Sequence, residues 1–438
     1  MNGVEAVALR KHFAPAVRRL LNIATLLGAL AGATAHAETW LYRVTLDPAD
    51  PLAARVTVEL PALRRAQDFS VQVRGLVAGL TPQVADLRCD GAPLAPDSAS
   101  AWGVQGWKCV RLSWTVPIRP VPETGFDPRG RDSVFDAQQR FWLFSEATSL
   151  LRPVDAVPHD GQVEFVGAAP VNGGLPVAGT SRRVVPAKDH SGEFYAIGRL
   201  SGASLREGGF DTLHLDALGI EWRELLAEHG RALGYLVRTA GTRQLAPLRS
   251  TVVWLAGVAD DGVPVGTAGD RTLLLSAARR DGRLLHPEFA LAWILREQLL
   301  QSLPERVPLW ARESLAQYYA VKALRRTELP VSSVAAVERR YLDGARAPSA
   351  PLLAAQRRAQ DGDLVALAEL RAAGAGFWER LDRAIVRKSG FRTLDSLLPR
   401  LLASDWPGDR LPPAVLDRLR DYAAEATVNE LLAQYLGG

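Results

Sequence analysis

Two acidic residues, Glu297 and Glu313, are the first candidates for chemistry because each lies within an otherwise apolar stretch of the chain. An ionised carboxylate buried in such a setting is costly unless a cation compensates it. Carboxylates in this kind of environment can act as a general base or as a metal ligand. We therefore expect a present or former functional site around these two residues.

The stretches that carry the two carboxylates are predicted to form a helix, a turn and a second helix. Apolar residues between positions 289 and 303 almost encircle a helix, which indicates an element buried on most sides. Pro304 ends this helix and Pro308 can begin the next one. Glu297 lies on the first predicted helix and Glu313 on the second.

The second predicted helix carries a specific pattern. Trp310, Glu313, Ala316 and Tyr318 stand at the spacing W-x-x-E-G-x-A-x-Y, with Ser314 in place of the glycine. This pattern resembles the gluzincin metallopeptidases, and within them it is most similar to the glycyl and alanyl aminopeptidase types. The resemblance implies that Glu313 occupies the position of a distal zinc ligand.

The first helix departs from the family's H-E-x-x-H motif. In that motif, histidines at positions i and i+4 share one helix face and bind the zinc ion, while the glutamate between them acts as general base. Here Arg296 and Leu300 stand at the two histidine positions, and only Glu297 remains, at the position of the base. We predict no metal and no other cofactor; zinc would be expected only if the interpretation as an inactive protein is wrong.

No other histidine restores the motif. None of the histidines after residue 37 has another four positions away, so no helix offers a paired imidazole face; they are His159, His190, His214, His229 and His286. His286 precedes the first helix but lies ten residues before Arg296, which is about 15 Å along a helix axis. It is therefore too far away to replace a missing ligand.

A fixed cation could replace the metal. We predict that Arg296 directs its guanidinium into the former zinc position and pairs with Glu313. In the alternative, Arg296 and Glu297 lie on a solvated strip, and Glu313 forms a weak surface pair with Arg312 or Arg306.

The resemblance also implies a substrate cleft bordered by a strand. Residues 271–276 are the candidate for this strand, and Arg271, Trp310 and Tyr318 are the candidate cleft residues.

The start of the chain is typical of an export signal. Four basic residues precede an apolar run from position 20 to 33, and Ala35-His36-Ala37 fits the small-residue rule for signal peptidase. We therefore expect a periplasmic or secreted protein without a stable membrane span after cleavage. The alternative is a retained membrane anchor, although the apolar run is short for a bilayer span of about 20 residues.

Charge and cysteine content are consistent with an exported protein. The chain has 52 basic and 48 acidic residues, and the part after residue 37 has 48 and 47. Because no basic block is interleaved with aromatic residues there, we expect no nucleic-acid partner. Cys89 and Cys109 are predicted to form a disulfide, which an oxidising compartment favours; two buried free thiols are the alternative.

The pattern of elements predicts an α+β multidomain protein. Residues 38–205 contain many short alternating strands and are predicted to form a β-sandwich domain after the signal peptide of residues 1–37. Residues 206–345 alternate strands with helices, and residues 346–438 are helical. The order resembles a β-sandwich, a thermolysin-like α/β middle domain and a C-terminal α-helical domain of the aminopeptidase families.

Three functions are compatible with these features. The first is a pseudoenzyme, a peptidase homologue that has lost zinc and catalysis and keeps its cleft to bind a peptide or a cell-envelope protein. The second is an active aminopeptidase-like metallohydrolase with atypical ligands. The third is a structural scaffold in which the former cleft is filled. Fold ancestry alone does not choose among them.

Overall fold

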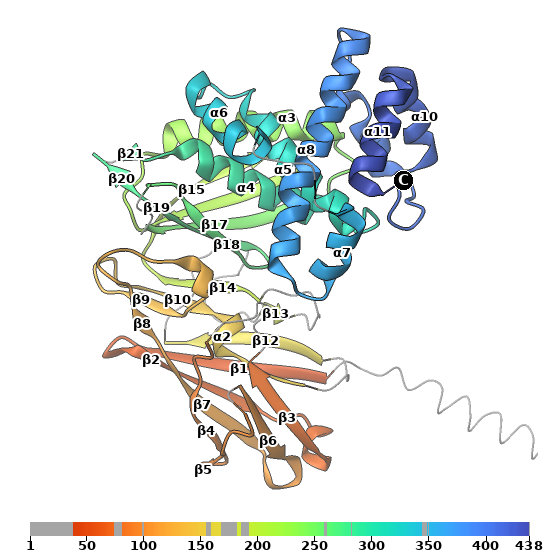
Figure 1. Ribbon diagram of the computed structural model, residues 1–438. Coiled ribbons are helices and arrows are strands. Elements are labelled where there is room, and N and C mark those ends of the chain that lie inside the picture. The colour runs from red at the N-terminus through yellow and green to blue at the C-terminus, as the bar shows by residue number, and fades with distance from the viewer. Residues whose placement is uncertain are drawn as a thin grey trace, which may run out of the picture.

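The computed structural model describes residues 38–73, 81–98, 100–154, 159–167, 182–184, 192–257, 261–281, 283–343, 348 and 350–437. The predicted signal peptide, residues 1–37, lies outside the described residues. Within the described part, no helix is both long enough and apolar enough to cross a membrane. The chain is an α+β multidomain protein in which a β-rich N-terminal region is followed by a mixed sheet and a helical C-terminal region (Figure 1).

The N-terminal region is built around a seven-stranded sheet with the order β13-β12-β1-β2-β7-β4-β5. Its strands are β1 (Glu38–Asp47), β2 (Asp50–Glu59), β4 (Ala85–Cys89), β5 (Ala92–Pro93), β7 (Arg111–Pro117), β12 (His159–Val166) and β13 (Arg182–Val184). Alternate side chains of β2 and β7 are buried, as expected for a sheet with one solvated face. The predicted disulfide between Cys89 and Cys109 is confirmed.

Two smaller sheets complete this region. The first has the order β11 (Leu151–Pro153), β3 (Asp68–Val73), β6 (Ala101–Gln105). The second has the order β14 (Phe194–Gly198), β10 (Phe141–Ser145), β9 (Val134–Asp136), β8 (Arg119–Pro120). Residues of all three sheets share one hydrophobic core, which includes Trp40, Trp102 and Trp142, so the region has the layered packing of a β-sandwich. Short helical turns connect the strands: η1 (Arg64–Ala66), η2 (Gly106–Lys108), η3 (Pro128–Gly130) and α2 (Glu146–Ser149).

The middle sheet has the order β15-β16-β17-β19-β18. The strands are β15 (Ser201–Glu207), β16 (Phe210–Asp216), β17 (Leu248–Ala256), β18 (Val265–Ala268) and β19 (Thr272–Ala277), followed by the hairpin β20 (Arg279–Arg280) and β21 (Arg283–Leu284). One face packs on β10 and β14 of the N-terminal region through a separate apolar cluster that includes Phe141, Phe194 and Leu274. The other face is covered by α3 (Trp222–Ala240), α4 (Pro287–Ser302) and α5 (Leu309–Leu324) (Figure 1).

The strand predicted to border the cleft is not the edge of this sheet. Residues 272–277 form β19, which is fully buried between β17 and β18, whereas β18 is the edge strand. The sequence did not reveal β18 because it has only four residues and contains Gly266, a residue that disfavours strands. Gly266 is needed there, since a Cβ atom would lie 2.5 Å from the ring of Trp293 on α4.

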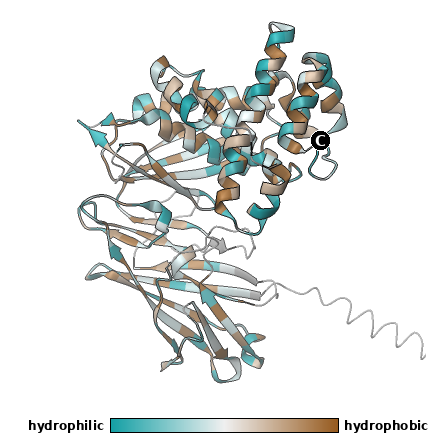
Figure 2. Cartoon of the chain, viewed as in Figure 1, coloured by the Kyte–Doolittle hydropathy of each residue, from teal (hydrophilic) through white to brown (hydrophobic). Residues whose placement is uncertain are grey.

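The predicted helix pair is confirmed. α4 ends at Ser302, shortly before Pro304, and Pro308 precedes the first residue of α5. Both helices are largely buried, and hydrophobic stretches line the strands beneath them (Figure 2).

The remaining helices follow α5 and pack beside it. They are α6 (Val331–Glu338), the π-helical turn η4 (Arg339–Asp343), α7 (Leu352–Gln360), α8 (Leu364–Ser389), η5 (Leu394–Ser396), α9 (Leu398–Ala403), α10 (Pro413–Tyr422) and α11 (Glu425–Leu436). α8 ends at Ser389, and the following Gly390 has a positive φ of 76°. A single core of buried residues extends from α3 to α11.

α8 crosses α5 at very short range. A Cβ atom on Gly374 of α8 would lie 2.4 Å from the Cβ of Ser314 on α5, so only glycine fits at this crossing. Trp378, four residues further along α8, donates its indole N–H to the Ser314 hydroxyl at 2.8 Å. This contact fixes which side chains of α8 face α5.

Candidate functional site

Glu297 and Glu313 are both buried, with 6 % and 4 % of their surface exposed. They lie on the adjacent helices α4 and α5. Buried carboxylates need a compensating cation, and the cation of Glu313 comes from a helix that the sequence did not connect to the site.

Arg371 of α8 supplies that cation. Its Nε donates to Oε2 of Glu313 at 2.7 Å. Arg371 lies three residues before Gly374 and therefore shares the face of α8 that packs on α5. Burial acts to lower the pKa of Arg371, but Glu313 and Glu297 outweigh it and raise this pKa above its usual value. Arg371 therefore interacts electrostatically with both carboxylates.

Glu297 is held by a second arginine. Nε of Arg296 donates to Oε1 of Glu297 at 3.1 Å, and a second guanidinium nitrogen donates to the same oxygen. Burial acts to raise the pKa of Glu297, but Arg296, Arg371 and Arg131 outweigh it and hold this pKa below its usual value. Glu297 is therefore an ionised carboxylate with little capacity to accept a proton. We refer to Glu297, Glu313, Arg296 and Arg371 as the arginine cluster.

Arg131 reaches this cluster from the N-terminal region. It follows η3, is almost completely buried, and donates from Nη2 to the carbonyl oxygen of Ala268 at 2.5 Å. Burial lowers the pKa of Arg131 to about 10, although Asp270, Glu193 and Glu297 oppose the shift. The arginine thus adds positive charge close enough to Glu297 to interact with it electrostatically.

Both predicted pairings of Glu313 are wrong. Arg296 binds Glu297 instead of Glu313, and Arg371 of α8 takes the place beside Glu313. The alternative partners are engaged elsewhere: Arg312 contacts the carbonyl of Leu300 at 3.4 Å, and Arg306 donates to the carbonyl of Leu402. Glu297 is also buried, not on a solvated strip.

The residues at this position do not fit a zinc ion. A zinc site requires about four N, S or O ligands at short distances, whereas here two carboxylates are each bound to a guanidinium. Within the described part of the chain, a group of three close His, Cys, Asp or Glu ligand atoms occurs only at Cys89, Asp90 and Cys109. The two sulfur atoms of that group form the disulfide.

A groove of about 780 Å³ opens beside the arginine cluster. Glu297 and Leu300 of α4 line it, and so does Arg271, which lies in the turn between β18 and β19. The structure therefore brings together three residues that the sequence placed at or near the site.

Trp310 and Tyr318 do not line this groove, contrary to expectation. Both are almost completely buried. Trp310 stacks on Trp378 with ring centroids 5.7 Å apart, because α8 covers the face of α5 that would otherwise be open. The aromatic residues of the second-helix motif belong to the packing between α5 and α8.

Sequence comparison finds no matching family model and no matching curated protein. The structure is similar to that of an aminopeptidase N family protein from Idiomarina loihiensis, with a TM-score of 0.57, 14 % identity, and coverage of 91 % of this chain and 74 % of that chain. The chain has the fold of the gluzincin aminopeptidases. An M1 zinc metallopeptidase from Deinococcus radiodurans also matches, with a TM-score of 0.46, 13 % identity, and coverage of 92 % of this chain and 94 % of that chain.

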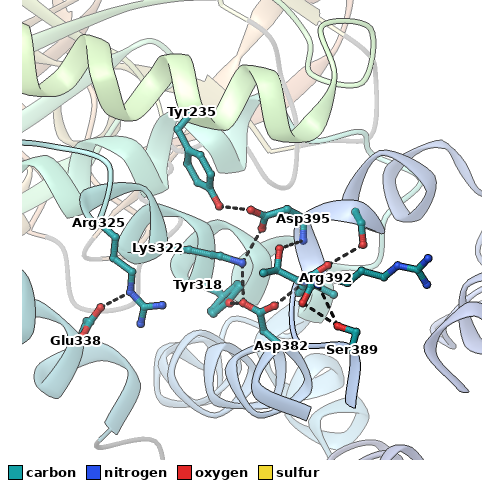
Figure 3. Close-up of polar contacts among 12 residues, drawn as sticks. Tyr235, Tyr318, Lys322, Arg325, Glu338, Asp382, Ser389, Arg392 and Asp395 are labelled. Carbon is teal, nitrogen blue, oxygen red and sulfur yellow. Dashed lines mark hydrogen bonds and ion pairs between the residues drawn. The ribbon is translucent and has the colours of Figure 1, made fainter. Parts of the chain in front are cut away.

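Tyr318, the last residue of the pattern on the second predicted helix, lies in a second buried cluster (Figure 3). Nζ of Lys322 is 2.6 Å from Oδ2 of Asp382 and 2.6 Å from Oδ1 of Asp395. Tyr318 donates to Asp382, and Tyr235 of α3 donates to Asp395 at 2.8 Å. We refer to these five residues as the lysine cluster. It joins α3, α5, α8 and η5.

Two histidines of this gluzincin-fold chain meet beneath α4. The indole of Trp254 donates to Nδ1 of His214 at 3.2 Å, and Nε2 of His214 lies 3.2 Å from Nδ1 of His229. Nε2 of His229 lies 2.9 Å from Oε1 of Gln298, the residue after Glu297. The indole can only donate, so each imidazole accepts at Nδ1 and donates at Nε2. Both rings are therefore neutral hydrogen-bond relays and not metal ligands.

Sequence reasoning missed Arg371, Arg131 and Lys322. A signal for Arg371 does exist in the run of small residues at 372–376, which permits a close helix crossing. The partner of that crossing cannot be read from local sequence. Arg131 and Lys322 belong to no recognisable sequence motif, so no pattern in the sequence assigns them to a site.

Proposed function

We propose that this chain is an exported gluzincin-fold protein that does not bind zinc or hydrolyse peptides, and that uses its groove to bind a peptide or a cell-envelope protein. The observation that supports the proposal is the position of Arg371. Its guanidinium carries positive charge between the two carboxylates that the family pattern assigns to catalysis and zinc binding.

The chemistry of the cluster explains the proposed loss of activity. Hydrolysis by a zinc peptidase needs a metal-bound water and a general base with a pKa near the working pH. The pKa of Glu297 is lowered by three arginines, and Glu313 is occupied by Arg371. A guanidinium cannot coordinate and activate a water molecule as a metal does.

The groove supports a binding role. Its volume of about 780 Å³ is within the range of roughly 300 to 1,000 Å³ typical of ligand sites. It is lined by Leu300, at one of the family's zinc-ligand positions, and by Glu297, at the position of the general base, and it remains open beside them. This argues against a scaffold in which the cleft is closed.

Metal content and hydrolysis test the loss of activity. We expect purified residues 38–438 to contain far less than one zinc per chain and to leave aminoacyl and peptide substrates intact after incubation with zinc. Glu297→Gln should then change nothing in the same assays. Stoichiometric zinc together with hydrolysis that Glu297→Gln abolishes would establish the atypical metallohydrolase instead.

Rebuilding the motif tests the role of Arg371. The variant Arg296→His with Leu300→His adds the two imidazoles of the family motif but keeps the guanidinium. We expect zinc binding by isothermal titration only when Arg371→Ala is added. If the double variant binds zinc as tightly as the triple variant, Arg371 does not occupy the zinc position.

Blocking the groove tests the binding role. Leu300 is half-buried in the groove wall, so Leu300→Trp should fill part of the space, whereas Leu364→Trp adds the same bulk at an exposed position on α8. We expect binding from an immobilised peptide library to be lost with the first variant and kept with the second. A chain that binds no peptide of the library would favour the scaffold.

Export rests on the sequence of residues 1–37. We expect the protein recovered from a cell envelope fraction to begin at Glu38 when its N-terminus is sequenced. An intact N-terminus on a membrane-associated protein would show that the segment is kept as an anchor.

A further inference from the structure

We propose that the groove selects a ligand with an anionic oxygen group, namely the carboxylate of an acidic peptide, and binds it with Arg271 and Arg312. This inference rests on the proposed binding function of the groove and specifies the ligand class. It follows from the balance of charges around the groove and from the hydrogen bonding of the two arginines.

The carboxylates of the groove already have cationic neighbours. Asp211 lies 3.5 Å from Nε of Arg249 and 3.4 Å from Nε of Arg206. Glu297 is bound by Arg296, and Asp270 interacts electrostatically with Arg131. The lining therefore offers no unbalanced negative charge to attract an amine.

Arg271 and Arg312 remain without a carboxylate partner within the described part of the chain. The ion pairs of Asp211 and Glu297 run to other arginines. Arg271 is exposed at the rim, while its backbone N–H donates to Oε2 of Glu193 at 3.1 Å and so fixes the main chain. Its guanidinium is thus presented to solvent from a rigid turn.

Arg312 is half-buried, and its guanidinium makes few of the hydrogen bonds that it could donate. Its Nη2 makes a single long contact of 3.4 Å to the carbonyl oxygen of Leu300. Its Nε is buried and has no hydrogen-bond partner in the described structure. A buried donor without an acceptor is costly, and an anionic acceptor in the groove would allow this guanidinium to reorient and form its hydrogen bonds.

The chemistry of the two arginines favours a carboxylate. A guanidinium presents paired donors that match the two oxygens of a carboxylate and is less heavily hydrated than an ammonium group. Leu248 and Leu300 provide apolar surface between the charged positions, which suits the aliphatic part of an acidic side chain. A ligand with a free ammonium group would instead meet the positive charges of Arg271 and Arg312.

Peptides that differ only in charge test the inference. The probes are fluorescein-labelled, acetylated and amidated heptapeptides with three Glu, three Gln or three Lys in the same alanine framework. We expect the Glu peptide to bind residues 38–438 at least about tenfold more tightly than the Gln peptide in fluorescence anisotropy, and the Lys peptide to bind weakest.

Matched arginine variants locate the effect. Arg312→Gln and Arg271→Gln should each reduce the preference for the Glu peptide by about tenfold, and an unchanged preference in both variants would overturn the assignment of these two arginines. Arg243→Gln, at an exposed position that does not line the groove, should leave the preference unchanged. Because Arg271 is exposed, its variant is expected to keep the thermal unfolding temperature of the wild type, so a folding defect cannot imitate the result.

The possible outcomes separate this inference from the proposed function. Equal binding of the Glu and Gln peptides would overturn the anionic selectivity while leaving a peptide-binding groove. Absence of binding by all three peptides would overturn both. Displacement of the Glu peptide by inorganic phosphate at a much lower concentration than by acetate would assign the site to phosphate groups and reject the carboxylate.

Discussion

The arginine cluster and the lysine cluster share helices α5 and α8 but balance their charges in opposite ways. The arginine cluster has two carboxylates and two arginines, with Arg131 adding a further positive charge nearby. The lysine cluster has two carboxylates and one lysine. The remaining hydrogen bonds to its carboxylates therefore come from hydroxyl groups and from a backbone N–H. One cluster borders an open groove, and the other is closed by packing.

The difference teaches that residues of one sequence motif can acquire unrelated roles. Glu313 and Tyr318 are five residues apart on α5, and both match the family pattern. Glu313 is neutralised next to the groove, whereas Tyr318 donates to Asp382 inside the helical layer. A matching motif therefore indicates the fold here, while the surrounding charges decide what each residue does.

The largest effect is expected from the lysine cluster. Lys322→Met leaves the buried Asp382 and the partly buried Asp395 without their shared cation, and loss of one partner of a buried ion pair costs about 3 to 5 kcal/mol. Urea unfolding followed by circular dichroism measures this loss of unfolding free energy. Lys108→Met, at an exposed lysine, is the control and should change it by less than about 0.5 kcal/mol. A loss below about 1 kcal/mol for Lys322→Met would show that the cluster does not stabilise the fold.

Acid is expected to destabilise the neutral histidine pair that underlies α4. Burial lowers the pKa of His229 to about 4, and burial and His229 together hold the pKa of His214 well below its usual range. The unfolded chain binds protons near pH 6.5, so stability is complete above this pH and falls as the pH drops towards 4. From His229 alone the loss is on the order of 3 kcal/mol.

Unfolding free energies measured between pH 7.5 and 4.5 test this expectation. His229→Gln removes the titrating ring and should flatten the decline, whatever its effect at neutral pH. His286→Gln, which changes a half-exposed histidine, should keep the wild-type slope. A flat wild-type profile from pH 6.5 to 5 contradicts the assignment of neutral imidazoles.

A smaller loss is expected from the arginine cluster. Arg371→Met removes the partner of Glu313, but the Arg371 side chain is 28 % exposed and Glu297 keeps Arg296. We expect a loss of about 2 to 3 kcal/mol in urea unfolding. Arg387→Met at an exposed position of the same helix is the matched control. A larger loss than for Lys322→Met would reverse the ranking of the two clusters.

The smallest effect is expected from the motif tyrosine. Tyr318→Phe removes one hydrogen bond to the carboxylate of Asp382 and should cost about 1 to 2 kcal/mol, with no change in ligand binding by the groove. Tyr319→Phe is the neighbouring control, since the Tyr319 hydroxyl is buried without a hydrogen-bond partner in the described structure. That variant should be neutral or stabilising. Weaker binding of peptide in the groove by Tyr318→Phe would show that Tyr318 contributes to the binding site after all.

The sequence predicted the helix pair because local rules determine it. Pro304 and Pro308 mark the turn between α4 and α5, and the apolar periodicity around them indicates burial. The alternating strands of the N-terminal region and the disulfide were predictable for the same reason. Each of these features depends on residues that are close together in the chain or on a single pair of cysteines.

The partners within the site were not predictable in the same way. Glu313 and Arg371 are separated by 58 positions, and their pairing depends on how α8 docks on α5. The groove likewise combines the turn before β19 with the second half of α4. Tertiary packing, which single-sequence patterns do not encode, decides these contacts.

The crossing of Gly374 over Ser314 also limits what mutation can do at this site. It holds Arg371 beside Glu313, so a single histidine introduced on α4 would meet carboxylates that are already paired with guanidinium groups. A zinc site there would need changes at positions 296, 300 and 371 together. The close approach of two backbones, which involves no charged atom, thus makes the charge pairing of Glu313 resistant to single substitutions.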